Sequence, residues 1–325
     1  METKIVLVTG IGGNVGQGIL RNINASFPEI KLIGTDIAEF TAGNYLCDKT
    51  YQTPYAYKEN FLSILKEIIK NENVDLIIPS TDYEVYYLSL HKKELNCVIA
   101  ANDAEIAKIY LDKYETYLYH NQNNIPFAKT WLPSEYNGDG KNIIAKPREG
   151  RGSRGIIINP KNIKSLSEDY IIQPLYKGKE ITTAVYVTKK KELHGIFSME
   201  RELSNGTTKR CKVCTDYDNH FSEIALKLME KTGIVGSFNI QSIVTASNEI
   251  VPFEINCRIS GTNSIRHNLG FQDVKYTIQE YLYNTEPEKP QARKGIATRI
   301  LLDIIYPDAV DENLLNNKNS NPIVY

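Results

Sequence analysis

Two predicted strands in the last third of the chain carry side chains that suit a magnesium ion. Glu254 and Asn256 are two residues apart in the run VPFEINCRIS, so both project from one face of a strand. Gln241, on the preceding predicted strand, can face them across a hairpin. One carboxylate and two amide oxygens suit Mg²⁺ that keeps its other positions for phosphate oxygens and water, and Arg258, further along the same face, could offset charge on a transferring phosphoryl group. The alternative is a strand with ordinary polar edge residues.

A loop rich in glycine and arginine could fold over a polyphosphate. The run KPREGRGSRG, residues 146–155, combines three glycines with three arginines and Ser153. Its backbone amides can donate hydrogen bonds while its arginines supply positive charge. It is not a Walker A loop, because the chain has no GxxxxGK[ST] run. The alternative is a solvated basic hairpin.

A second glycine cluster, GIGGNVGQG, follows an apolar run near the N-terminus. Gly10, Gly13 and Gly16 give the spacing GxxGxxG, and Asp36 stands 20 residues after Gly16. This is close to a dinucleotide-binding turn, in which the backbone approaches a pyrophosphate and the carboxylate binds ribose. The strict GxGxxG spacing is not met, so a tight strand-to-helix turn without a nucleotide is the alternative.

Two other sequence patterns are weaker indications of a catalytic or metal-binding site. Tyr186 and Lys190 are four residues apart, as in short-chain dehydrogenases, but they fall in a predicted strand, where four residues span about 13 Å. Cys211 and Cys214 form a CxxC pair without the second pair of ligands that a structural zinc site needs. The five cysteines are odd in number and irregularly spaced, so they predict no disulfide framework.

The elements that must position these residues alternate in the first third of the chain. Short apolar runs predict buried strands, and amphipathic runs between them predict helices. This alternation indicates βαβ units and a parallel sheet. The predicted strands are 4–9, 31–36, 74–80 and 96–101, and the predicted helices are 15–25, 58–70 and 82–95.

After about residue 100 the pattern changes to strands joined by hairpins. The glycine-rich loop connects two adjacent predicted strands, which indicates a hairpin and not a strand-to-helix turn. The last 40 residues predict a linker, one strand and a polar tail. The other predicted elements are a helix after residue 111, a β-rich stretch at 170–201, a helix at 217–232, strands at 236–244 and 249–260, and the late strand at 297–305.

Composition narrows the class of protein. The 325 residues correspond to about two domains. Lys plus Arg number 38 and Asp plus Glu number 39, so the net charge of −1 argues against a general nucleic-acid binder. There is no apolar run of the ~20 residues that a membrane span needs, and no signal-peptide pattern, so we expect a cytoplasmic protein that binds neither nucleic acid nor membrane.

Taken together and in order, these segments resemble the ATP-grasp superfamily, especially its carboxylate–amine ligases that are similar to the carbamoyl-phosphate synthetase large chain. The resemblance runs from the N-terminus to about residue 305 and implies an α/β and α+β fold. A Rossmann-like domain at 1–100 would precede a two-lobed ATP-grasp fold. Its central lobe would be 101–175, with the glycine-rich loop at 149–155, and its C-terminal lobe 176–325, with the metal site.

The resemblance also implies an ATP site between the lobes. Two lysines would contact the phosphates, the glycine-rich loop would close over them, and the hinge between the lobes would hold the adenosine. The implied residues are Lys113, Lys146 and, further along, Lys209 for the phosphates; Arg151, Gly152 and Ser153 in the loop; the backbone around Gln173 and Leu175 for adenine; and Glu180 for the ribose hydroxyls.

By the same resemblance, Gln241, Glu254 and Asn256 would hold Mg²⁺, which Mn²⁺ could replace, while Arg258 and Lys146 would act on the γ-phosphate. The chain departs from the family pattern at three positions. Gln173 and Gln241 stand where many members have carboxylates, and Cys257 stands where proline is frequent.

The substrate side would include the N-terminal glycine turn, which in this family need not bind NAD. Gly12, Gly13 and Asn14 would lie there, and Arg201 and Arg266 are candidate clamps for a substrate carboxylate because a guanidinium grips a carboxylate with two bonds. His267 is the one histidine expected near the site, more as a packed polar residue than as a ligand.

The function expected from these motifs is ATP-dependent ligation of a small-molecule carboxylate to an amine through an acyl phosphate, with release of ADP. Many members of the family form homodimers. One alternative is an NAD(P)-dependent reductase or epimerase that uses Gly10–Gly16 and Asp36. The other is a non-catalytic nucleotide-binding module. The sequence does not identify the acid or the amine.

Overall fold

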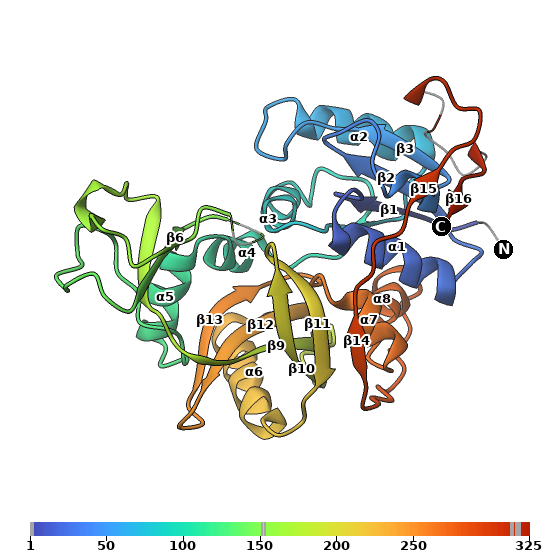
Figure 1. The fold of residues 1–325 in the computed structure, drawn as a ribbon. Coiled ribbons are helices and arrows are strands. Elements are labelled where there is room, and N and C mark those ends of the chain that lie inside the picture. Colours follow the sequence, from blue (N-terminus) through green and yellow to red (C-terminus); the bar gives the residue numbers. More distant parts are fainter. Residues whose placement is uncertain (1–2, 151, 153, 313–314, 316–319) are drawn as a thin grey trace.

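The computed structural model describes residues 3–150, 152, 154–312, 315 and 320–325 (Figure 1). Its N-terminal part is a five-stranded sheet in the order β3-β2-β1-β4-β5, and every pair of neighbouring strands is parallel. The predicted parallel sheet is therefore confirmed, while β3 was not predicted. The strands are β1 (Ile5–Thr9), β2 (Lys31–Asp36), β3 (Lys49–Gln52), β4 (Leu76–Ile78) and β5 (Val98–Ile99).

Helices cover both faces of this sheet because alternate residues of β1 point to opposite sides. Val6 and Val8 pack in one apolar cluster with α1 (Asn14–Ser26), and Leu7 packs in another with α2 (Phe61–Glu72) and α3 (Asp82–Leu90). Strands that are buried on both faces need continuous apolar runs, which is what the sequence offers. A short helical turn, η1 (Asn44–Leu46), precedes β3.

Two consecutive helices lead out of the sheet to a small lobe. They are α4 (Ala104–Leu111), which was not predicted, and α5 (Lys113–Gln122). The lobe is an antiparallel three-stranded sheet in the order β7-β6-β8, built from β6 (Ile143–Pro147), β7 (Ile157–Ile158) and β8 (Tyr170–Pro174), with η2 (Ile163–Ser165) before β8. The glycine-rich loop joins β6 to β7, so the hairpin prediction is confirmed.

The largest sheet is a six-stranded antiparallel one in the order β13-β12-β9-β10-β11-β14. Helix α6 (Asp218–Thr232) packs against it, with Phe221 and Leu228 fully buried in the shared core. Its strands are β9 (Gly178–Val187), β10 (Leu193–Ser204), β11 (Thr207–Val213), β12 (Gly236–Thr245), β13 (Ile250–Asn256) and β14 (Ile296–Thr298).

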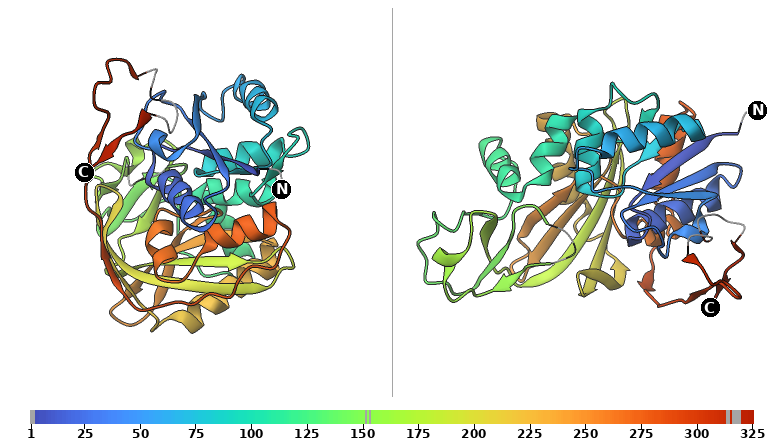
Figure 2. Two further views of the ribbon diagram at one scale, coloured as in Figure 1. Left: turned by 90° about the vertical axis from the view of Figure 1, so that its right-hand side faces the viewer. Right: turned by 90° about the horizontal axis from the view of Figure 1, so that it is seen from above.

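Segments far apart in sequence close the molecule around its N-terminal domain. Helices α7 (Asn263–Asn268) and α8 (Asp273–Thr277), and the π-helical turn η3 (Ile278–Leu282), pack beside α1, and Figure 2 shows this contact between the blue and orange segments. A Cβ at Gly18 would lie 2.2 Å from the Oδ1 of Asn263, so only glycine permits the approach. The N-terminal sheet is thereby joined to the six-stranded sheet.

One prediction about the end of the chain is wrong. The single strand expected at 297–305 is two strands, because the chain leaves the edge of the six-stranded sheet after β14, which pairs with β11. Further on, β15 (Ile304–Ile305) pairs with β16 (Ile323–Val324) in a separate hairpin. Among the described residues, no helix has both the length and the apolar character needed to cross a bilayer.

Candidate active site

Four neighbouring strands of the six-stranded sheet display a connected row of polar side chains. Gln241 on β12 lies directly opposite Glu254 on β13. The amide nitrogen of Gln241 donates to Oδ1 of Asn256 at 3.0 Å, and the amide nitrogen of Asn256 donates to Oε1 of Glu254 at 3.2 Å. Arg201 on β10 extends the row, donating to Oε1 of Gln241 at 2.5 Å and twice to Oε1 of Glu180 on β9. The residues expected to bind metal and ribose thus form one network.

Two lysines from other segments converge on Glu254. The Nζ of Lys113 lies 3.9 Å from Oε1 of Glu254 and donates to the carbonyl of Gly150 at 3.2 Å. Lys146, on β6, donates to the carbonyl of Phe253 at 3.4 Å. Burial by itself would raise the pKa of Glu254, but Lys113 and Lys146 outweigh it and the pKa is lowered. Helix α5, strand β6 and strand β13 therefore bring three predicted site residues together.

Lys146 is in an unusual electrostatic state. The residue is 7 % exposed, and its Nζ lies 4.8 Å from the centre of the Phe253 ring. Burial lowers the pKa of Lys146 to about 7, against the attraction of Glu254, because a buried ammonium loses its hydration. The side chain can therefore change its protonation state near neutral pH when a further negative charge enters the site.

Local sequence explains how Lys113 is held. Asp112 precedes α5 and its carboxylate accepts the backbone N–H of Tyr114, which makes it the N-cap of the helix. The other carboxylate oxygen of Asp112 accepts two hydrogen bonds from Arg148, at 2.9 and 2.6 Å. The first residue of the helix is thereby fixed to the strand that ends in the glycine-rich loop.

Arg258 follows β13 and meets a residue that was not predicted from the sequence to be part of the site. Its guanidinium donates to Oδ2 of Asp82 at 2.7 Å and to the carbonyl of Ile259 at 3.1 Å. Asp82 begins α3 at the carboxyl end of β4, where Thr81 and Glu84 form a capping box. The run STDYE after an apolar strand was the signal for such a residue, because ligands bind at the carboxyl ends of parallel strands.

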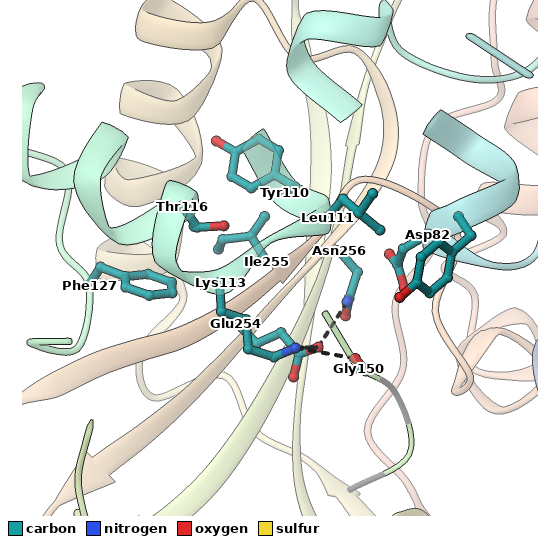
Figure 3. A pocket seen from close by; sticks show the side chains of 11 residues that line it. Asp82, Tyr110, Leu111, Lys113, Thr116, Phe127, Gly150, Glu254, Ile255 and Asn256 are labelled. Carbon is teal, nitrogen blue, oxygen red and sulfur yellow. Dashed lines mark hydrogen bonds and ion pairs between the residues drawn. The ribbon is translucent and has the colours of Figure 1, made fainter. Parts of the chain in front are cut away.

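A pocket lies between these groups (Figure 3). It is bounded by the start of α3 and the end of α4 on one side, and by α5, the glycine-rich loop and β13 on the other. Glu254 and Asn256, predicted to bind metal, therefore line one pocket with Lys113, predicted to bind phosphate, whereas Gln241 and Lys146 are not among its lining residues. The lining residues are Asp82, Tyr83, Tyr110, Leu111, Lys113, Thr116, Phe127, Gly150, Glu254, Ile255 and Asn256.

The structure places the predicted loop residues only in part. Arg151 and Ser153 lie outside the described residues. Gly152 is described, with φ +64°, and it touches the turn between β10 and β11: a Cβ at Gly206, which has φ +71°, would lie 2.1 Å from the Gly152 carbonyl oxygen. Lys209, on β11, is exposed, and its carbonyl accepts the N–H of Arg299. A phosphate contact by Lys209 stays a prediction.

The hinge residues are engaged with protein groups. Gln173 is buried, and its side-chain amide donates to the Thr130 hydroxyl at 2.9 Å. The N–H of Leu175 donates to the Asn142 carbonyl at 2.8 Å, so it would have to leave that partner to bind adenine. Adenine binding here stays a prediction, as does ribose binding by Glu180, whose carboxylate forms an ion pair with Arg201.

The N-terminal glycine turn lies beside the loop that follows β13. The N–H of Gly12 donates to Oδ2 of Asp36 at 2.8 Å, so this carboxylate fixes the turn. Gly13 is the N-cap of α1, and a Cβ at Gly261 would lie 2.9 Å from the side-chain nitrogen of Asn14. The turn is therefore next to the loop that follows β13.

The prediction that Arg266 clamps a substrate carboxylate is wrong. Arg266 is completely buried, and it forms two hydrogen bonds with Asp273, at 3.0 and 2.6 Å. Its remaining donors bind Ser260 and Thr262. It holds α7 against α8 and has no surface on which a ligand could bind.

A different arginine lies where the clamp was expected. Arg299, which follows β14, donates to the carbonyl of Gly261, beside the glycine turn. Burial lowers the pKa of Arg299, and the positive charges of Arg21 and Arg201 lower it further. The described residues give Arg299 no carboxylate partner within ion-pair distance. Arg299 was not predicted as a site residue, because residues 297–305 were predicted to form one strand.

Cysteine and histidine play no visible part in this site. All five cysteines are free, and the described residues contain no group of three or more His, Cys, Asp or Glu side chains placed to share a metal. Gln241, Glu254 and Asn256 do not form such a group, because only one of the three is a carboxylate. His267 is mostly buried, as expected of a packed polar residue.

Models of two known domains match most of the chain. The model of the PylC-like N-terminal domain matches residues 6–107, and the model of the ATP-grasp domain matches residues 110–262. No curated protein shows a significant sequence match.

Solved structures show the same fold at low sequence identity. N5-carboxyaminoimidazole synthetase from Staphylococcus aureus, complexed with ADP, has a TM-score of 0.76 at 15 % identity and covers 93 % of this chain and 83 % of its own. Carboxyaminoimidazole ribonucleotide synthase from Aspergillus clavatus, complexed with ATP, has a TM-score of 0.70 at 15 % identity, with 96 % and 85 % covered. L-amino acid ligase from Bacillus licheniformis has a TM-score of 0.69 at 10 % identity, with 89 % and 76 % covered.

Proposed function

This chain belongs to the ATP-grasp superfamily, and from that premise we propose that it is an ATP-dependent carboxylate–amine ligase. The observation that carries the proposal is the convergence of Lys113 from α5 and Lys146 from β6 on Glu254 of β13, with Arg258 directly after the end of that strand. A triphosphate needs concentrated positive charge, and a transferring phosphoryl group needs charge positioned around it.

The donor set at the pocket fits a magnesium ion. Glu254 presents a carboxylate whose ionised form is favoured by two lysines, and Asn256 lies beside it. Oxygen ligands with few charges suit Mg²⁺, which shares its coordination with phosphate. Gln241 would join them by exchanging Arg201 for the ion. When bound, the ion would neutralise charge on the phosphate oxygens.

The reaction we propose proceeds in two balanced steps. A carboxylate oxygen of the acid attacks the γ-phosphorus, the bond to the β-phosphate oxygen breaks, and ADP leaves. The ammonium of the acceptor first loses one proton to solvent. The free amine nitrogen then attacks the acyl carbon, the carbon–oxygen bond to phosphate breaks, and the second proton goes to the departing phosphate. Lys146 and Arg258 would offset negative charge on the transferring group. Catalysis would therefore come from the positions of the reacting groups and from electrostatic stabilisation.

Arg299 would hold the acid. It lies between the glycine turn and the loop after β13, with Arg201 near enough to influence its pKa. A guanidinium without a carboxylate partner favours an anionic ligand, and the N-terminal segment Gly12–Asn14 would form the opposite wall. This assigns to Arg299 the clamping role that we expected from Arg266.

The reductase alternative finds no support among the described residues. Tyr186 is buried and donates to Glu280 at 2.8 Å, so it has no access to a substrate. Asp36, which would bind ribose, accepts the N–H of Gly12 instead.

The direct test is a panel of carboxylates assayed with MgATP and hydroxylamine, which traps acyl phosphates as hydroxamates. Hydroxamate and ADP should appear in equal amounts for at least one acid. The Glu254→Ala variant should abolish both, whereas Glu249→Ala, an exposed position in the turn before the same strand, should leave both unchanged. ADP that forms at the wild-type rate in Glu254→Ala would refute the assignment.

A further inference from the structure

In the ion pair between Asp82 and Arg258, one buried polar atom of each side chain lacks a hydrogen-bond partner among the described residues. Oδ2 of Asp82 accepts from Arg258 at 2.7 Å, but its Oδ1 is buried and has no hydrogen-bond partner among the described residues. The Nε of Arg258 is likewise buried without an acceptor. Leaving a buried charged group short of a hydrogen bond is unfavourable, so both groups are suited to ligands that complete their bonding.

The two groups would receive ligands of opposite charge. Arg258 lies two residues after Asn256, just past the end of β13, where a phosphate or acyl phosphate is expected, and it would donate to such an oxygen. Asp82 lines the same pocket from α3 and can accept hydrogen bonds only (Figure 3). A protonated amine is the ligand that a free aspartate in this pocket would bind.

Aromatic rings beside Asp82 support a cationic ligand. Tyr83, the next residue, lines the pocket. The ring of Tyr57 lies edge-on to it with centres 6.0 Å apart, and Tyr55 stacks on Tyr57 at 5.3 Å. Tyr55 and Tyr57 are half-exposed, and the Nζ of Lys58 already lies 5.5 Å from the centre of the Tyr57 ring, so Tyr83 is the member of this group that lines the pocket. Ammonium groups bind favourably to tyrosine faces.

The charges now in the pocket would oppose an amine that arrived first. Lys113 lines the pocket, and the carboxylates of Glu254 and Asp82, which also line it, are already paired with Lys113 and Arg258. Nucleotide phosphates would neutralise these cations and draw Arg258 away from Asp82. The amine should therefore bind after the nucleotide.

We propose that Asp82 is the binding residue for the amino group of the acceptor, and that it becomes available when Arg258 turns to the nucleotide. This inference rests on the proposed ligase function and adds to it the site and the charge of the amine. It also predicts an order of binding, nucleotide first, that the function alone does not require.

A structural test needs no knowledge of the natural substrates. The wild-type protein would be crystallised with Mg²⁺ and a non-hydrolysable ATP analogue, with and without methylammonium chloride. We expect Arg258 on the γ-phosphate and methylammonium within hydrogen-bond distance of Asp82. A bound analogue with the Asp82–Arg258 pair intact would overturn the inference alone, whereas an analogue that binds elsewhere would overturn the proposed function as well.

A binding test uses a matched pair of variants. Methylammonium would be titrated by calorimetry into protein with and without the saturating analogue, with sodium chloride as the ionic-strength control. Its affinity should rise at least 10-fold with the analogue, and Asp82→Asn should abolish that rise. Asp103→Asn, an exposed carboxylate before α4, should retain it. Equal affinity in wild type and Asp82→Asn, with the analogue bound in both, would refute the role of Asp82.

Discussion

Nucleotide affinity should depend on pH through Lys146. Burial lowers the pKa of Lys146 to about 7 in the free protein, while its ordinary value is 10.5. A triphosphate beside the Nζ would favour the ammonium form, so binding above pH 7 must take up a proton. If the bound form stays protonated, ATP affinity should fall about 50-fold between pH 7 and pH 9, which is about 2.3 kcal/mol.

Calorimetry in buffers of different ionisation enthalpy measures this proton directly. The uptake on nucleotide binding should be about half a proton at pH 7 and close to one at pH 8. Lys146→Arg should remove the pH dependence, since a guanidinium stays charged throughout, whereas Lys141→Arg, an exposed change just before the same strand, should retain it. A flat affinity from pH 7 to 9 without proton uptake would refute the reasoning.

The lowered pKa of Lys146 should also make the free energy of unfolding depend on pH. Because the folded pKa of Lys146 lies below the unfolded value, the unfolded chain holds more protons between pH 7 and 10.5. The contribution of Lys146 to the free energy of unfolding should therefore increase as the pH rises through that window. Urea titrations of the wild type and Lys146→Met at pH 7 and 9 should show this difference, and equal pH dependence in both would contradict it.

Three further outcomes are expected from the structure. Glu254→Gln should weaken Mg²⁺-dependent ADP binding at least 10-fold by calorimetry, because the carboxylate of the ligand set is lost; unchanged binding would contradict the metal assignment. Arg266→Ala should lower the free energy of unfolding by about 3–5 kcal/mol, because Asp273 is left buried without its partner, and a loss below 1 kcal/mol in urea would contradict that. Gly16→Ala should cost about 1–3 kcal/mol, because its Cβ would lie 2.5 Å from the Gly10 carbonyl oxygen, and an unchanged melting temperature would contradict it.

Local patterns in the sequence were sufficient for the fold class. Buried parallel strands, the hairpin around the glycine-rich loop and the pair of strands with Gln241, Glu254 and Asn256 follow from periodicities of two and 3.6 residues. These periodicities depend only on the backbone geometry of each element. Side chains that share a face of one strand can therefore be recognised without knowledge of what packs against it.

Two errors show where such patterns fail. Arg266 looked like a clamp because its type suits a carboxylate, but Asp273, seven residues later, buries it in an internal ion pair. Arg299 was hidden in an assumed strand, because the sequence does not show that the chain leaves the sheet after Thr298. Exposure and partner choice depend on neighbours that come from other elements.

By itself, then, the sequence determined the parallel N-terminal sheet except for β3, the hairpin around the glycine-rich loop, and the facing of residues within one strand pair. Only the tertiary structure decided that Lys146 would be buried close enough to Glu254 to titrate near neutral pH, and that Arg258 would pair with Asp82, 176 residues away. The physical reason is the separation along the chain of the residues that interact. Strand and helix periodicities are fixed by bonds between successive residues, whereas desolvation and ion pairing depend on the packing of distant segments.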